Sequence, residues 1–248
     1  MGLPKIAVPE YSLKLPSDGK ELRYRPFLVK EEKLLLLAME SEDDTQIMTA
    51  TKNVLKNCIF DDINVDDMAI FDIEYIFLWL RGRAKGEKLE LKYTCPKCNS
   101  TLPVDLNLED IEVTKAEGHE KKIQLTDNIG IALKYPNMAM QSKIEKIDSE
   151  NEVEIMFKSI QLCIDYIYDN ETIYSNKDHT EKELEEFIES LTDEQFKSLG
   201  TFFETMPKLQ HKLNLVCNGS VMKEGKKKKT NCDYKEEITL EGLQSFFA

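Results

Sequence analysis

Short stretches in which apolar and polar residues alternate recur along the chain and predict β-strands. Alternation over 11–15 and again over 22–24 flanks the segment Pro16-Ser17-Asp18-Gly19. Proline presets one backbone dihedral and glycine permits a positive φ, so this segment predicts a turn. The three stretches together predict a β-hairpin that ends at Pro26. A second hairpin is predicted over 87–108, where alternating residues lead into Cys95 and out of Cys98.

Helical spacing of apolar residues fills the region between these two hairpins. It predicts helices over 30–40, over 43–58, and from 64 to the glycines at 82 and 86. The first of these contains the run Leu34–Met39, which is strongly apolar. Burial statistics favour a buried core helix for this run, and the alternative is an apolar surface that binds a partner.

The second half of the chain shows the same order of patterns. A hairpin is predicted over 123–135, followed by helices over 140–147 and 152–168. Capping boxes, in which a threonine and an acidic or amide side chain satisfy free backbone N–H groups, begin helices at Thr180 and Thr192. Alternation then leads into Cys217 and out of Cys232. The polar segments 41–46, 114–122 and 169–181 predict loops, and 221–231 predicts a hairpin tip or a flexible excursion.

We therefore predict an α+β fold made of two similar halves, each with a hairpin, helices and a cysteine-bearing hairpin. The halves are residues 1–112 and 121–248, and the second carries a helical insertion. They would form one compact unit through a shared cysteine site of the zinc-ribbon type. The alternative is that short alternating strands recur by chance.

The four cysteines of these hairpins are the candidate metal ligands. Cys95-Pro96-Lys97-Cys98 lies between two predicted strands, where a tight turn directs both sulfurs to one side. Zinc requires a tetrahedral set, and Cys217 and Cys232 supply the second pair. A redox Cys-x-x-Cys motif would instead precede a helix in a βαβ unit, whereas strand-like residues follow here. We expect a structural Zn²⁺ site, with two pairs of core thiols without a metal as the alternative.

The remaining cysteines and histidines receive structural interpretations. Cys58 and Cys163 lie among apolar residues in predicted helices and are expected to be buried free thiols. His119, His179 and His211 lie in polar or boundary segments and are expected at the surface, although His211 could replace a cysteine ligand. No set of acid, base and nucleophile converges in the sequence, so we predict that the chain is not an enzyme.

Composition and charge narrow the choice of partners. Apolar residues form 41% of the chain and charged residues 32%, enough for a sizeable core with a solvated surface. A net charge of −13 argues against nucleic acid and against anionic membranes as partners. The longest apolar run, Leu34–Met39, is far shorter than the roughly 20 residues of a membrane span. We expect a soluble protein of a reducing, intracellular compartment.

One segment carries a resemblance to a known family. The hairpin that ends in Arg25-Pro26-Phe27-Leu28-Val29-Lys30-Glu31-Glu32-Lys33, followed by a leucine-rich helix, resembles the baseplate hub assembly proteins of T-even-like contractile-tailed phages. The later Tyr93-Thr94-Cys95-Pro96-Lys97-Cys98 segment also suits that family. The resemblance implies phage tail assembly, with other baseplate hub or tail proteins as partners. It implies a location in the host cytoplasm during assembly or in the virion baseplate, as a structural protein or an assembly chaperone.

The function that follows is an assembly or structural role by protein–protein interaction, with a structural zinc site. The alternative is a zinc-ribbon nucleic-acid-binding module, in which Lys226–Lys229 reaches phosphate groups. Such a module would bind in a salt-sensitive way, because each neutralised phosphate releases counterions.

Overall fold

The computed structural model describes residues 6–41, 43–144, 147, 151–222 and 229–242. Contacts divide the chain into two compact units, each built from separate stretches of sequence. Unit 1 comprises Met1–Asp62, Glu74–Thr114 and Lys208–Ala248, and unit 2 comprises Ile63–Ile73 and Lys115–Pro207. No helix in the described ranges is both long and apolar enough to cross a membrane.

The predicted first hairpin is confirmed in unit 1. Strands β1 (Tyr11–Lys14) and β2 (Glu21–Tyr24) pair in antiparallel register, and the glycine of the turn, Gly19, has a positive φ of 74°. Helices α1 (Val29–Glu40) and α2 (Asp44–Cys58) follow and pack against each other. The carboxylate of Asp43 begins α2 by accepting hydrogen bonds from the N–H groups of Thr45 and Gln46.

Helix α3 (Ile70–Lys85) begins later than the sequence predicts. Asn64 caps only a short 3₁₀ turn, Val65–Asp67, and Met68 then leaves helical geometry with an extended ψ of 139°. The boundary between the two units falls within α3, after Ile73.

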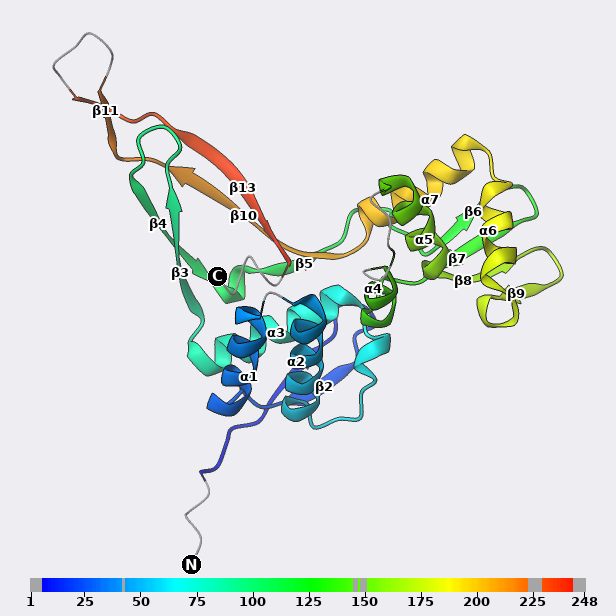
Figure 1. Ribbon diagram of the computed structural model, residues 1–248, viewed down its shortest axis with the longest axis horizontal. Coiled ribbons are helices and arrows are strands. Elements are labelled where there is room, and N and C mark those ends of the chain that lie inside the picture. Colours follow the sequence, from blue (N-terminus) through cyan, green and yellow to red (C-terminus); the bar gives the residue numbers. More distant parts are fainter. Residues whose placement is uncertain (1–5, 42, 145–146, 148–150, 223–228, 243–248) are drawn as a thin grey trace, which may run out of the picture. The chain divides into compact units, whose positions relative to one another are not determined.

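The remaining strands of unit 1 form antiparallel pairs around its core. The hairpin of β3 (Lys88–Thr94) and β4 (Thr101–Asn107) confirms the prediction for 87–108. A short 3₁₀ turn, Leu108–Asp110, leads to a three-stranded sheet in the order β13 (Lys235–Glu241), β10 (Lys208–Val216), β5 (Glu112–Thr114). Figure 1 shows the β3–β4 hairpin beside β10 and β13. Apolar side chains from both pairs form one buried cluster, which includes Leu91, Leu106 and Leu213.

The predicted hairpin tip over 221–231 is described in part. Strands β11 (Ser220–Met222) and β12 (Lys229–Asn231) pair in antiparallel register. Residues 226–228 of the Lys226–Lys229 run lie outside the described residues.

Unit 2 contains a four-stranded antiparallel sheet and helices. The strand order is β6 (Lys122–Gln124), β7 (Gly130–Leu133), β8 (Ile164–Tyr168), β9 (Ile173–Ser175). The helices are α4 (Met138–Ile144), α5 (Glu152–Cys163), α6 (Glu181–Glu189) and α7 (Asp193–Thr205), and a 3₁₀ turn spans Asn176–Asp178. Both predicted capping boxes are confirmed, at Thr180 for α6 and at Thr192 for α7.

Two predictions in this region are wrong. The helix predicted over 152–168 ends at Cys163, and the residues that follow form strand β8. They are rich in isoleucine and tyrosine, which favour strands, and they pair with both β7 and β9. The predicted loop 169–181 contains β9 for the same reason, since its residues complete the edge of this sheet.

The α+β class is therefore established, with small antiparallel sheets and separate helices. The division into halves 1–112 and 121–248 stays a prediction, because compact units are defined by contacts and a duplication is defined by sequence. The contacts place the C-terminal cysteine hairpin in unit 1, with the first cysteine hairpin.

Candidate metal centre

The first cysteine pair lies in a tight turn between β3 and β4. The N–H of Cys95 donates to the carbonyl of Ser100 at 2.9 Å, and the N–H of Asn99 donates to the carbonyl of Cys95 at 2.8 Å. Asn99 adopts a left-handed conformation with φ of 56°, which asparagine tolerates better than most residues. This turn brings Cys95 and Cys98 to one end of the hairpin, as the sequence predicts.

The second pair lies where the β10–β13 ladder meets the β11–β12 tip. The N–H of Cys217 donates to the carbonyl of Tyr234 at 3.0 Å, and the N–H of Cys232 donates to the carbonyl of Gly219 at 2.7 Å. The N–H of Gly219 also lies 3.3 Å from Cys217 Sγ, in position to stabilise a thiolate. The ladder thus holds two residues that are 15 positions apart.

The four sulfur atoms converge on one point. All lie within 4.8 Å of one another. Cys95 Sγ is 3.8 Å from Cys232 Sγ, and Cys98 Sγ is 3.4 Å from Cys217 Sγ. A tetrahedral Zn²⁺ site with Zn–S bonds of about 2.3 Å would have sulfur–sulfur edges of about 3.8 Å. These separations are too long for disulfide bonds of about 2.05 Å, so the geometry fits a tetrahedral metal ion.

The surroundings of the cluster are apolar on one side and polar on the other. Cys95, Cys217 and Cys232 are buried with Leu102 and Leu215, whereas Cys98 is partly exposed. On the exposed side, an ion pair joins Lys97 of the first turn to Asp233 of the second. Three of the four sulfurs therefore belong to buried residues, and the Lys97–Asp233 ion pair joins the two hairpins beside the cluster.

The thiols of the cluster differ in acidity. Hydrogen bonds from the side chain and the backbone N–H of Ser100 lower the pKa of Cys98 to about 6. Burial raises the pKa of Cys217 to about 12, and burial also raises the pKa of Cys232. A bound divalent cation would favour the thiolate form of all four sulfurs, since metal ligation requires deprotonated cysteine.

Two residues that support the cluster were not identified from the sequence. Ser100 lies with its Oγ 3.2 Å from Cys98 Sγ. Gly219 approaches so closely that a Cβ atom there would lie 2.4 Å from Ser100 Oγ and 2.9 Å from Cys98 Sγ. The sequence signal for Gly219 was its position two residues after Cys217, in the place where a backbone N–H reaches the sulfur.

The other two cysteines lie elsewhere and are buried, as predicted. Cys58 is 0% exposed and Cys163 is 1% exposed. Burial raises the pKa of Cys58 to about 11 and that of Cys163 to about 12. Both are therefore protonated, poorly reactive thiols at neutral pH.

The prediction for His119 is wrong. This side chain is 6% exposed and packs against the rings of Tyr135 and Phe202, with ring centroids 5.7 Å and 5.1 Å away, and those two rings also contact each other. Its Nδ1 is 2.9 Å from Thr205 Oγ1. The polar sequence around His119 concealed its burial, because the rings that cover it come from distant positions. His211 is not part of the cysteine cluster, and its Nδ1 lies 3.2 Å from the carbonyl of Asp110.

Comparison with known proteins gives one match. A family model described as "T4 bacteriophage base plate protein" matches residues 8–248. Curated proteins and solved structures give no match. The family match covers nearly the whole chain, and it confirms the resemblance that begins at Arg25.

Proposed function

Because the chain belongs to the family of T4 bacteriophage base plate proteins, we propose that it acts in assembly or structure of the baseplate hub through protein–protein contacts. In the proposal, a structural zinc ion held by Cys95, Cys98, Cys217 and Cys232 stabilises unit 1. The observation that carries the zinc part is the convergence of four sulfurs within 4.8 Å. The role is one of binding and scaffolding, with other baseplate or tail proteins as partners.

The donor set indicates a structural site. Four thiolates complete a tetrahedron and leave no open position for water or substrate. The ion would link the turn after β3 to the ends of β10 and β13, which are more than 100 residues away along the chain. The four sulfurs come together only in the folded chain, so the free energy of zinc binding would add to the stability of unit 1.

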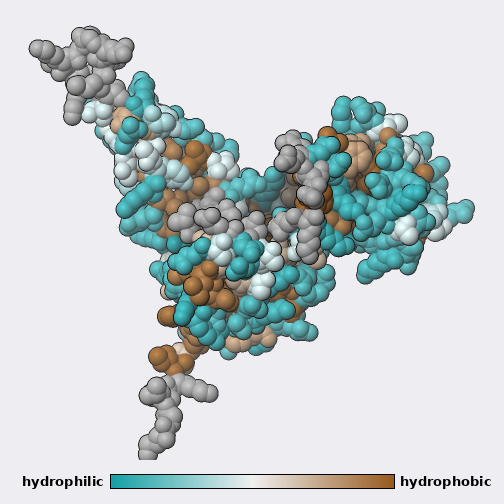
Figure 2. Space-filling view, in the orientation of Figure 1, coloured by the Kyte–Doolittle hydropathy of each residue, from teal (hydrophilic) through white to brown (hydrophobic). Residues whose placement is uncertain are grey.

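An apolar surface on α1 supports contact with a protein partner. Burial was the favoured prediction for the run Leu34–Met39, and this is wrong for three of its members. Leu36, Leu37 and Met39 are 53%, 54% and 45% exposed. Val29 lies two helical turns before Leu36, on the same side of α1, and is 81% exposed. Figure 2 shows apolar side chains gathered on the surface over α1. Exposed apolar patches of this kind mark interaction sites.

The zinc proposal is tested on purified protein by metal analysis and X-ray absorption. We expect about one zinc per chain, with four sulfur neighbours at about 2.3 Å. Cys95→Ser and Cys217→Ser are expected to lose zinc, whereas Cys58→Ala and Cys163→Ala retain it. A wild-type protein that contains no metal, and that takes up none when reduced and supplied with zinc, would disprove the site.

The hub proposal is tested by co-expression with each hub and tail protein of the same phage. We expect a stable complex with at least one of them, weakened by Leu36→Ser combined with Leu37→Ser. Ile173→Ser is the matched control, because Ile173 is an exposed isoleucine of unit 2. Failure to form any complex would refute the assembly role.

Two further experiments separate the remaining alternatives. Mass spectrometry of purified virions distinguishes a virion component from an assembly chaperone. A gel shift at low salt tests the nucleic-acid alternative.

A further inference from the structure

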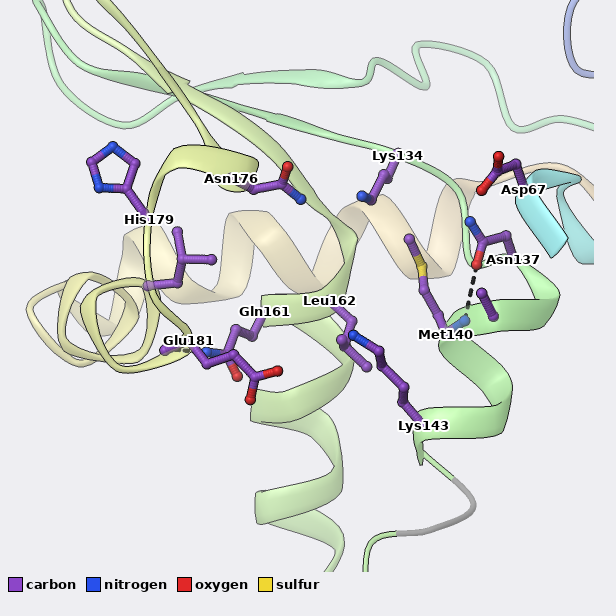
Figure 3. Close-up of a pocket in the computed structure, with 12 residues that line it drawn as sticks. Asp67, Lys134, Asn137, Met140, Lys143, Gln161, Leu162, Asn176, His179 and Glu181 are labelled. Atoms are coloured by element: carbon purple, nitrogen blue, oxygen red, sulfur yellow. Dashed lines mark hydrogen bonds between the residues drawn. The ribbon is translucent and has the colours of Figure 1, made fainter.

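A pocket of about 330 Å³ lies in unit 2, remote in sequence from the cysteine cluster. Its apolar wall is formed by Met140, Leu162 and Leu184, from helices α4, α5 and α6. Figure 3 shows polar side chains from several elements around the same space. The volume is at the lower end of the range of about 300–1,000 Å³ for ligand sites, which suits one or two side chains of a bound segment.

The charged side chains that line this pocket differ in their ion pairing. Lys134 and Lys143 both line it, and neither Nζ has an ion-pair partner within the part of the chain that is described. The lining also contains two carboxylates. Asp67 accepts a hydrogen bond from the neutral amide of Asn64 at 2.6 Å, which leaves its charge in place, and Glu181 pairs with Lys158 at 2.7 Å and also interacts electrostatically with Lys143. With Lys158 included, the three lysines outnumber the two carboxylates by one, and one anionic group can balance this excess.

Two amides border the pocket in fixed orientations. Asn176 Nδ2 donates to the carbonyl of Ile164 at 2.6 Å, which fixes the orientation of the amide. Its Oδ1 is fully buried and has no hydrogen-bond partner among the described residues, so it is closed to a ligand in this conformation. Asn137 Oδ1 accepts from the N–H of Met140 at 2.9 Å, shown dashed in Figure 3, so its Nδ2 remains as a donor at the pocket.

We propose that this pocket binds an acidic segment of a protein partner. A glutamate or aspartate carboxylate of the segment lies between Lys134 and Lys143, and a backbone carbonyl of the segment accepts a hydrogen bond from Asn137 Nδ2. An inorganic anion satisfies the lysines but leaves the wall of Met140, Leu162 and Leu184 uncovered, whereas a peptide supplies both a carboxylate and apolar atoms for that wall.

The test uses the full chain and a fluorescein-labelled, blocked peptide, Gly-Leu-Glu-Glu-Leu-Gly, with its Gln-Gln counterpart as the uncharged probe. Fluorescence polarisation at low salt is expected to show Kd for the Glu-Glu peptide about tenfold lower than for the Gln-Gln peptide. Lys134→Gln combined with Lys143→Gln is expected to abolish this preference. Lys177→Gln combined with Lys197→Gln removes the same charge from exposed positions of unit 2 and is expected to preserve it.

A second measurement needs no variant. Acetylation of lysines in the wild-type chain, read by mass spectrometry, is expected to slow at Lys134 and Lys143 when the Glu-Glu peptide is present, and to be unchanged at Lys177 and Lys197. Equal binding of the two peptides, or equal loss in both double variants, overturns the proposal. Acetate or phosphate binding as tightly as the peptide also overturns it, because the pocket would then recognise a free anion.

Discussion

A buried ion pair between Arg25 and Glu31 lies at the start of α1, within the segment whose sequence resembles the baseplate family. Its removal gives the sharpest test of how this segment is stabilised. The carboxylate of Glu31 is 1% exposed. It accepts hydrogen bonds from Arg25 Nη2 at 2.9 Å and from the N–H of Leu28 at 2.9 Å. The Arg25 side chain is 11% exposed and also donates to the carbonyl of Pro26 at 3.0 Å. Glu31 thus joins the end of the first hairpin to the first turn of α1.

The substitution Glu31→Gln removes the charge and keeps an oxygen that accepts from Leu28. Removing one member of a buried pair costs about 3–5 kcal/mol, because the other charge is left unpaired. A retained helix cap is worth about 1 kcal/mol, so we expect a loss of about 3 kcal/mol for Glu31→Gln and about 4 kcal/mol for Glu31→Ala. At about 2–4 °C per kcal/mol, Glu31→Gln is expected to lower Tm by about 6–12 °C.

The assay is urea unfolding, followed by far-UV circular dichroism and by fluorescence of Trp79, the single tryptophan, which lies in unit 1. Glu32→Gln is the control, since Glu32 pairs with the half-exposed Lys85 and such pairs contribute about 0–1 kcal/mol. Arg25→Met combined with Glu31→Leu removes both charges and is expected to recover most of the loss. Equal losses for Glu31→Gln and Glu32→Gln, or no recovery in the double variant, would refute this account.

Three further predictions follow from single positions. Gly219→Ala is expected to weaken zinc binding, measured by competition with a chromophoric chelator, and to cost about 1–3 kcal/mol, because the added methyl group overlaps Ser100 and Cys98. Burial, followed by the charges of nearby lysines, lowers the pKa of His119 from its usual 6.5. The unfolded chain therefore gains a proton near pH 6.5 that the folded chain does not bind, so the free energy of unfolding decreases as pH falls below that value. Thermal unfolding across this pH range should show a smaller decrease in Tm for His119→Phe than for the wild type. Thr180→Ala should lower the unfolding free energy by about 1 kcal/mol, measured by urea unfolding, since it deletes the cap of α6.

Much of the local structure was predictable from sequence because local physics determines it. The turn of the first hairpin needs proline and glycine at particular positions, and the capping boxes at Thr180 and Thr192 need only residues three apart. The Cys95–Cys98 turn is likewise a local motif, since its hydrogen bonds join residues no more than five positions apart. The identity of the four clustered cysteines followed from this motif and the alternation around the other pair.

The tertiary structure decided what depends on distant partners. Residues 164–168 are a strand because β7 and β9 supply hydrogen-bonding edges on both sides. The spacing of apolar residues within this segment does not indicate these distant partners. His119 is buried because rings 16 and 83 positions away cover it. Leu36 and Leu37 are exposed because α1 presents only one face to α2. Burial and strand pairing are set by contacts between segments far apart in the chain, so only the folded structure determines which apolar residues are left for a partner.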